Sequence, residues 1–174
     1  PLVAIPNNIP IFHFFGGAIT EGAIDELIRH SITKMSHYHF VLLDEYKKRL
    51  FQLGEETWRV KKIGMPNLIS IKSYKPENIE ILSKYLKFDL TKPYMVVTYH
   101  PVTLELSKLR FQINSLIKAI KISNLNAIVT YPNSDPRFKE IIKLFKNELK
   151  NRKKFLLVKN LGEEHYFSIM RYAK

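Results

Sequence analysis

The sequence contains no cysteine among its 174 residues, and no apolar run in it approaches the ~20 residues of a membrane-spanning helix. The first absence excludes disulfides and thiolate-held zinc or iron–sulfur sites, and it fits a reducing compartment. The opening residues, Pro1 to Asn8, also lack the basic and apolar regions of a secretory signal. We therefore expect a cytoplasmic location and no membrane partner.

Negative charge is scarce as well, since 16 Asp and Glu residues stand against 28 Lys and Arg residues and give a net charge of +12. Such a charge suits a polyanion only where the basic residues cluster on one face. Here they are spread from Arg29 to Lys174, and 21 of the 28 are lysines, as an AT-rich coding sequence would produce. We therefore expect no nucleic-acid partner.

Short apolar runs alternate with longer segments of helical periodicity, a pattern typical of parallel strands joined by crossover helices. We predict strands at residues 9–15, 39–43, 60–63, 94–98, 127–131 and 155–158. We predict helices at residues 23–36, 44–53, 106–122, 135–149 and 163–173. Most of these strands are apolar throughout, so both faces of each sheet should be buried. The expected fold class is α/β with parallel sheets.

Turn-forming residues gather between the third and the fourth strand, in Gly64-Met65-Pro66-Asn67, Lys75-Pro76 and Lys92-Pro93. We therefore predict the C-terminal part of a first domain in residues 1–64, a junction in residues 65–93 and the N-terminal part of a second domain in residues 94–174.

A glycine-rich turn, His13 to Gly22, follows the first strand and leads into a helix. Gly16 and Gly17 let the backbone approach a ligand, and the free N–H groups of a helix start suit an anion or a sugar. The turn has neither the Rossmann nor the P-loop spacing of glycines, so a plain connector is the other interpretation.

The helix after this turn carries two pairs of charged residues at i,i+4 spacing, Asp25 with Arg29 and Glu26 with His30. One interpretation is ordinary surface pairing. The other makes Asp25, near the positive end of the helix, a general base, while Arg29 and His30 steady an anion. The residues alone leave both open. His37 and His39 further along have a spacing that could hold a metal, but no third ligand lies nearby in the sequence, so we expect no metal site.

Two predicted strands end in polar residues next to proline. Tyr99-His100-Pro101-Val102-Thr103 follows one strand, and Tyr131-Pro132-Asn133-Ser134-Asp135 follows the next. Ligands of open α/β sheets bind beyond the carboxyl ends of the strands, and a histidine there can donate to a phosphate or shuttle a proton. The alternative is a pair of helix caps and proline turns.

Taken together, these segments resemble the hydrolysing UDP-N-acetylglucosamine 2-epimerases of the sialic-acid pathway. The residues that carry the resemblance follow in order along nearly the whole chain: Gly16-Gly17, Thr20 to Glu26, Ile28-Arg29-His30, Ile32 to His37, Tyr99 to Thr103 and Tyr131 to Asp135. His100-Pro101-Val102-Thr103 is the part most specific to the hydrolysing branch, because the non-hydrolysing branch has His-Arg there.

The resemblance implies two Rossmann-like domains of the B-type glycosyltransferase architecture, with a UDP-sugar between them, no cofactor, and a homo-oligomer. It implies a hydrolase and isomerase of amino-sugar metabolism and sialic acid biosynthesis, which converts UDP-N-acetylglucosamine to N-acetylmannosamine and UDP by elimination and then hydration. Asp25 and His100 match catalytic positions, and His100 would meet the UDP phosphates. The resemblance also places the substrate-binding residues at Gly16, Gly17, Thr20, Glu21, Arg29, His30, Thr103, Asn133 and Asp135.

The chain departs from the family at two places in the glycine-rich turn. Phe15 and Ala18 stand where the family commonly has acidic residues, including a catalytic Glu, and neither can move a proton. Glu21 is the nearby carboxylate that could replace the missing one. The chain also begins at Pro1 and ends at Lys174 without the family's flanking phosphate-binding segments, so we expect an interior fragment or truncated form with little or no activity of its own. The alternative is a non-catalytic binding or assembly module derived from the same fold.

Overall fold

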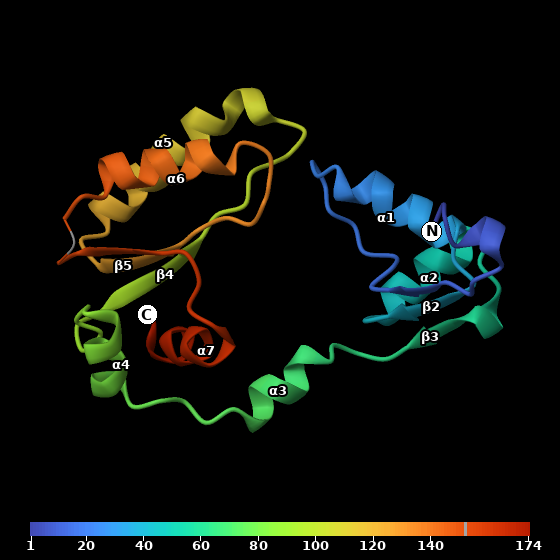
Figure 1. Ribbon diagram of the computed structural model, residues 1–174, viewed down its shortest axis with the longest axis horizontal. Helices are drawn as coiled ribbons and strands as arrows, with labels where there is room; N and C mark the ends of the chain where they lie inside the picture. Colours follow the sequence, from blue (N-terminus) through green and yellow to red (C-terminus); the bar gives the residue numbers. More distant parts are fainter. Residues whose placement is uncertain (152) are drawn as a thin grey trace. The chain divides into compact units, whose positions relative to one another are not determined.

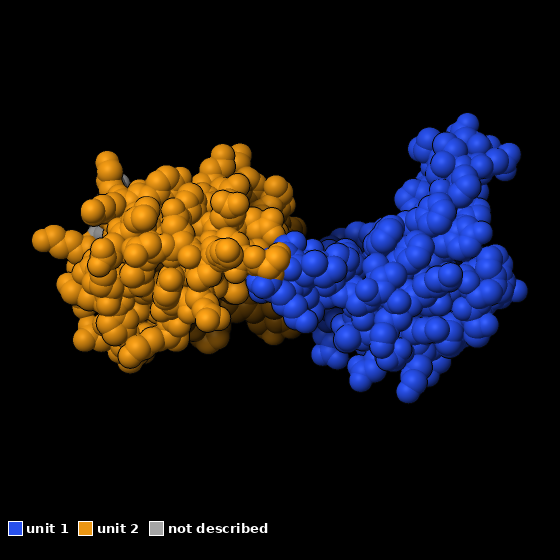
Figure 2. Space-filling model, turned by 90° about the horizontal axis from the view of Figure 1, so that it is seen from below, with its two compact units in different colours: residues 1–72 blue, residues 73–174 orange. Residues whose placement is uncertain are grey.

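The chain folds into two compact units, residues 1–72 and residues 73–174, in a computed structural model that describes residues 1–151 and 153–174 (Figures 1 and 2). Each unit holds a parallel sheet of three strands in the order of the sequence, β1-β2-β3 in the first and β4-β5-β6 in the second. The division between Lys72 and Ser73 falls inside the segment 65–93, where turn-forming residues gather in the sequence.

Unit 1 alternates strands and helices. Its elements are η1 (Ile5–Asn7), β1 (Phe12–Phe14), α1 (Asp25–Lys34), β2 (Tyr38–Val41), α2 (Asp44–Gln52), η2 (Thr57–Arg59), β3 (Val60–Lys62) and α3 (Asn67–Ser73), which ends at the unit boundary. Its core is small and centres on Val41, Leu50 and Val60. Helix α1 has two acidic residues in its first turn and Lys34 in its last, as the helix dipole favours.

The apolar side chains of α1 do not form the buried face that their spacing predicts. Leu27 is 68% exposed, Ile24 and Ile28 are about half exposed, and the fully buried residue of the helix is Thr33. The Thr33 hydroxyl donates to the Arg29 carbonyl at 3.1 Å, so its burial leaves no unsatisfied donor. Periodicity identifies an apolar stripe but not what covers it.

The first sheet also differs from the expectation that both faces are buried. Phe12 and Phe14 are 53% and 51% exposed, while His13 between them is buried. The exposed rings stack on their neighbours in β2, with centroids 5.1 Å apart for Phe12 and Tyr38 and 4.8 Å apart for Phe14 and Phe40. Aromatic pairing across strands thus stabilises a face that the described residues leave open.

Unit 2 is the larger unit and has two hydrophobic clusters, one on each face of its sheet. Its elements are α4 (Ile79–Leu86), β4 (Tyr94–Thr98), η3 (Leu106–Lys108), α5 (Leu109–Ile122), β5 (Asn126–Thr130), α6 (Phe138–Glu148), β6 (Phe155–Val158) and α7 (Glu163–Tyr172). Helices α5 and α6 cover one face and α4 and α7 the other (Figure 1). Alternate residues of β5 serve the two clusters, with Ala127 and Val129 in one and Ile128 in the other.

Two helices, α3 and α4, lie in the segment that the turn formers led us to read as a junction. The start of α4 carries a helix signal that was missed: the Asn78 side chain accepts from the backbone N–H groups of Glu80 and Ile81. Helix α6 begins at Phe138 rather than at residue 135, because Pro136 and the left-handed Arg137 (φ 62°) delay it. The predicted α/β class with Rossmann-like parallel sheets is confirmed.

Candidate functional site

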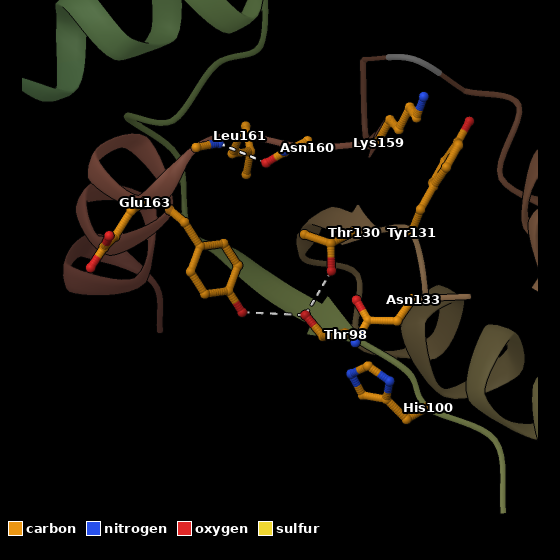
Figure 3. A pocket seen from close by; sticks show the side chains of 11 residues that line it. Thr98, His100, Thr130, Tyr131, Asn133, Lys159, Asn160, Leu161 and Glu163 are labelled. Carbon is orange, nitrogen blue, oxygen red and sulfur yellow. Dashed lines mark hydrogen bonds between the residues drawn. The ribbon is translucent and has the colours of Figure 1, made fainter. Parts of the chain in front are cut away.

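A cavity of about 260 Å³ lies beyond the carboxyl ends of β4, β5 and β6 in unit 2 (Figure 3). It is lined by Thr98, His100, Thr130, Tyr131, Asn133, Lys159, Asn160, Leu161, Gly162, Glu163 and Tyr166. Parallel strands in register bring their ends to one edge of the sheet, and Thr98 is the direct partner of Thr130. The cavity therefore lies at the edge where the sequence predicts a ligand site, and the site itself stays a prediction.

Three hydroxyl groups of the cavity lining are joined to one another. Thr98 Oγ1 lies 2.7 Å from Thr130 Oγ1 and 3.3 Å from the Tyr166 hydroxyl, so the ends of two strands and helix α7 are joined by hydrogen bonds (Figure 3). Each hydroxyl can donate or accept, which lets the three adjust to a ligand.

His100 stands at the mouth of the cavity, with 51% of its side chain exposed. Its Nδ1 lies 3.0 Å from Asp135 Oδ2. Because a carboxylate only accepts hydrogen bonds, Nδ1 carries the proton in this pair, and Nε2 is the nitrogen left for a ligand. Pro101, which is buried, follows directly and limits the backbone of His100. The Asn133 amide also faces the cavity (Figure 3).

Helix α7 begins at the same cavity. Gly162 precedes it with φ 72° and ψ 161°, a conformation that favours glycine, and the Asn160 side chain accepts from the Gly162 N–H at 2.9 Å. Gly162 and Glu163 at this end of the helix line the cavity, and the unpaired N–H groups of a helix start stabilise an anion. Lys159 adds a positive charge to the lining.

Sequence reasoning missed Lys159, Asn160, Gly162 and Tyr166. The signal present was Asn160-Leu161-Gly162 between the last predicted strand and the last predicted helix. Of the predicted residues, His100 and Asn133 line the cavity; Asp135 meets His100, and Thr103 follows in the turn after β4.

The glycine-rich turn of unit 1 packs tightly against α2. A Cβ on Gly17, whose φ is 79°, would lie 2.5 Å from the Tyr46 carbonyl oxygen. Two arginines hold the carbonyls of this turn: Arg49 donates to Gly17, and Arg29 donates to Ala18 at 3.1 Å. Both contacts fix the course of the backbone, so glycine at position 17 has a packing role whatever it binds.

Glu26 is the carboxylate around which the predicted residues of unit 1 gather. Its Oε2 accepts from the Thr20 N–H at 2.6 Å and lies 3.4 Å from Arg29 NH1, while its Oε1 lies 3.1 Å from His30 Nε2. The Thr20 hydrogen bond and the nearby His30 and Arg29 lower the pKa of Glu26 below its ordinary value. The expected pair of Glu26 with His30 is thus present, whereas Arg29 contacts Glu26 rather than Asp25.

The other predicted residues of this region are exposed. Asp25 and Glu21 both lie on the surface, Asp25 in the first turn of α1 and Glu21 in the turn before it. Phe15 adopts a left-handed conformation (φ 67°) with a side chain 45% exposed, and its N–H donates to the Phe40 carbonyl. An exposed aromatic ring therefore occupies a position where the family commonly has a carboxylate.

Unit 1 also contains a group of polar residues around Glu55, buried except for Lys34. His39 Nε2 is 3.0 Å from Glu55 Oε2, and Lys34 Nζ is 2.7 Å from Glu55 Oε1. Glu55, whose side chain is only 3% exposed, keeps a lowered pKa because these partners outweigh the effect of its burial. His13 packs edge-on against His39, and burial followed by the charge of His39 lowers the pKa of His13 to about 4. Among residues 1–151 and 153–174 no three His, Asp or Glu side chains come together as a metal site.

Solved structures with the same fold include UDP-GlcNAc 2-epimerases. The chain superposes on UDP-GlcNAc 2-epimerase from Neisseria meningitidis bound to UDP-GlcNAc with a TM-score of 0.72 at 15% identity, covering 99% of this chain and 48% of that one. It superposes on the Methanocaldococcus jannaschii enzyme in complex with UDP-GlcNAc and UDP with a TM-score of 0.73 at 20% identity, covering 99% and 49%. The fold is therefore that of the nucleotide-sugar 2-epimerases.

The sequence comparisons define the family. The model of the UDP-N-acetylglucosamine 2-epimerase family matches residues 1–174. Among curated relatives, the GDP/UDP-N,N'-diacetylbacillosamine 2-epimerase (hydrolyzing) of Campylobacter jejuni is 42% identical over 99% of this chain and 45% of its own length. The UDP-N,N'-diacetylbacillosamine 2-epimerase (hydrolyzing) of Legionella pneumophila is 38% identical over 77% of this chain and 35% of its own length. The chain belongs to the UDP-N-acetylglucosamine 2-epimerase family.

The chain spans about half the length of the curated relatives that it matches along its whole length, for example 45% of the Campylobacter jejuni enzyme. None of the described helices combines the length and the apolar character that crossing a bilayer requires.

Proposed function

We propose that this chain forms part of a hydrolysing 2-epimerase of a UDP-linked 2-acetamido sugar, and that unit 2 binds the UDP. The observation that carries the proposal is His100 at the end of β4, fixed by Asp135 and facing a cavity that also receives Asn133 and the start of α7. A diphosphate needs donors and positive charge as it leaves, and His100, Lys159 and the N–H groups of α7 provide both.

The reaction needs a base at the sugar and a stabilised leaving group. In the proposed chemistry Asp25 takes the C2 proton while the bond from C1 to the UDP oxygen breaks and its electron pair leaves with UDP, which forms a C1–C2 double bond. Water then adds a hydroxyl to C1 and a proton returns to C2. Family membership supports the assignment of Asp25, and its place in the first turn of α1 puts it next to the glycine-rich turn.

Part of a first Rossmann-like domain is proposed for residues 1–64 and part of a second for residues 94–174. The proposal includes binding contributions from Gly16, Gly17, Thr20, Glu21, Arg29, His30, Thr103, Asn133 and Asp135. It also includes a homo-oligomer and a cytoplasmic location, the latter supported by the absence of cysteine.

The relatives favour one sugar over another. Two curated relatives of 42% and 38% identity are named for UDP-N,N'-diacetylbacillosamine, whereas the Neisseria meningitidis relative named UDP-N-acetylglucosamine 2-epimerase is 30% identical. We therefore place UDP-N,N'-diacetylbacillosamine ahead of UDP-N-acetylglucosamine as the substrate. Both sugars carry the acetamido group next to the carbon that loses UDP.

Phe15 and Ala18 favour a second candidate, a non-catalytic module that binds a UDP-sugar or pairs with a complete subunit. The Phe15 ring is exposed, is apolar and cannot move a proton. A member of this family that no longer turns over its sugar would still use the His100 cavity.

Release of UDP from each of the two UDP-sugars separates these functions. Turnover by the chain that falls at least about 100-fold in both Asp25→Asn and His100→Ala, but not in the exposed control Glu45→Gln, supports the epimerase. Turnover that appears only in Phe15→Glu supports a protein derived from an epimerase in which Phe15 has replaced an acidic residue. UDP binding without turnover in either chain supports the binding module, and the absence of both binding and turnover contradicts both candidates.

A further inference from the structure

The Glu26 carboxylate uses both of its oxygens, and the two oxygens hold different parts of unit 1. Oε2 accepts from the Thr20 N–H at 2.6 Å, and Oε1 faces His30 Nε2 at 3.1 Å. Thr20 belongs to the turn after β1, whereas His30 lies on α1, one helical turn after Glu26. One side chain therefore joins the backbone of the turn to an imidazole ring.

Arg29 reinforces this arrangement from the same side. Its NH1 lies 3.1 Å from the Ala18 carbonyl oxygen and 3.4 Å from Glu26 Oε2. The turn is thus held at a carbonyl and at an N–H two residues apart, by a positive and a negative group that also contact each other. Charge-assisted hydrogen bonds of this kind are stronger than neutral ones.

The contact with Glu26 determines which nitrogen of neutral His30 carries the proton. A carboxylate oxygen only accepts, so the hydrogen in the pair lies on Nε2. Nδ1 then keeps its lone pair, which agrees with its surroundings, because Nδ1 is buried and has no hydrogen-bond partner among the described residues. A proton on Nδ1 would be a buried donor without an acceptor, which is costly.

We propose that Glu26 is a positioning residue that fixes the tautomer and orientation of His30 and ties them to the turn at Thr20. The importance of this role for catalysis rests on the proposed epimerase function; the role itself rests on the contacts above. Asp25, the residue before Glu26, lies outside this cluster. The two adjacent carboxylates of α1 therefore differ in role: Asp25 is exposed, whereas Glu26 positions His30 and the turn at Thr20.

Glu26→Gln tests the proposal because an amide cannot replace both carboxylate oxygens. If the amide oxygen keeps the Thr20 N–H, the NH₂ group faces His30 and requires an acceptor, so the proton of neutral His30 moves from Nε2 to Nδ1. If the amide turns around, His30 keeps its tautomer but the Thr20 N–H loses its acceptor. The first result moves the proton of His30 to the other ring nitrogen, and the second breaks the contact with Thr20.

The measurement is nuclear magnetic resonance of isotope-labelled protein at about pH 8, where an ordinary histidine is neutral. The nitrogen shifts of His30, assigned with His30→Gln, report the tautomer, and hydrogen exchange reports the Thr20 amide. We expect the tautomer of His30 to invert in Glu26→Gln, or the Thr20 amide to exchange about tenfold faster. Asp25→Asn is the matched control and should change neither.

A folded Glu26→Gln protein with the His30 tautomer and the Thr20 exchange rate of the original chain would overturn the proposal. No substrate enters this experiment, so its failure is independent of a failure of the turnover assay. Folding of unit 1 is checked in the same spectra by the amide signals of β2 and β3, which belong to the same unit as Glu26.

Discussion

His13 shows how one buried histidine makes the stability of a unit depend on pH. It lies in β1 between two exposed phenylalanines, with Thr33 Oγ1 3.3 Å from its Nδ1 and His39 edge-on against its ring. Burial, the charge of His39 and the charges of Arg29 and His30 lower its pKa from 6.5 to about 4. The folded unit therefore favours the neutral form of the His13 ring.

Acid should weaken unit 1 through His13. Between pH 6.5 and pH 4 the unfolded chain binds a proton at this residue and the folded chain does not, so stability rises with pH in that interval and is lost as pH falls. We expect the contribution of His13 to fall by about 2 kcal/mol between about pH 7 and pH 5. Urea unfolding followed by the fluorescence of Trp58 measures this loss of stability. Trp58 is the only tryptophan of the chain and packs against the Tyr38 ring in unit 1.

The decisive comparison is with His13→Asn. This variant should be less stable at neutral pH but should lose less stability on acidification than the original chain. His100→Gln, in the other unit, should leave the pH dependence of the Trp58 transition unchanged. Equal slopes for His13→Asn and the original chain would show that His13 is not the group that titrates.

The contacts of Glu26 explain why it was not recognised as a site residue from the sequence. Its spacing to His30 predicts a pair on the helix surface, and that pair is present. Its contact with the Thr20 N–H depends on the path of the turn, which no spacing encodes. Asp25 instead drew the functional interpretation, through its place at the start of the helix and then through the family resemblance, and its catalytic role stays a prediction.

Among the elements, the strands were predicted best. Residues 94–98 and 155–158 are strands with the predicted bounds, because their apolar β-branched and aromatic residues leave little choice. Helix α4 was missed because Pro76 and Pro93 beside it suggested turns, although Asn78 caps its start. The cavity-lining residues after β6 were missed for another reason: they reach His100 only because β6 pairs with β5 and α7 turns back over the sheet.

The turn after β1 gives a prediction at the same scale. Gly17→Ala should cost more than about 3 kcal/mol of unfolding free energy, because the new Cβ meets the Tyr46 carbonyl and Leu50 Cδ1 and cannot move away from backbone. Gly64→Ala is the matched control: its φ of 72° is as unfavourable, but nothing lies within 4 Å of its Cβ, so about 1 kcal/mol is expected. Urea midpoints read from Trp58 compare the two, and equal costs would contradict the close packing of the turn.

On the scale of the whole molecule, the family and the fold class follow from the sequence, whereas the distribution of site residues needed the structure. The predicted residues fall into two groups, one around Glu26 in unit 1 and one around the His100 cavity in unit 2. Residues scattered from Thr98 to Tyr166 share that cavity because three parallel strands end at one edge. The chain spans about half the length of the curated relatives that it matches along its whole length. The activity of the whole protein is therefore a proposal, and the part of it that this chain can test is the binding of UDP to unit 2.

Titration of the isotope-labelled chain with UDP, followed through its amide signals, tests whether unit 2 holds the nucleotide. We expect shifts at Thr98, His100, Asn133 and Gly162, and a dissociation constant at least about tenfold higher in His100→Ala, because a charge-assisted contact to phosphate is lost. Asn147→Ala, an exposed position on α6, should bind as the original chain does. Shifts confined to other parts of the chain, or equal affinity in His100→Ala, would contradict a UDP site at this cavity.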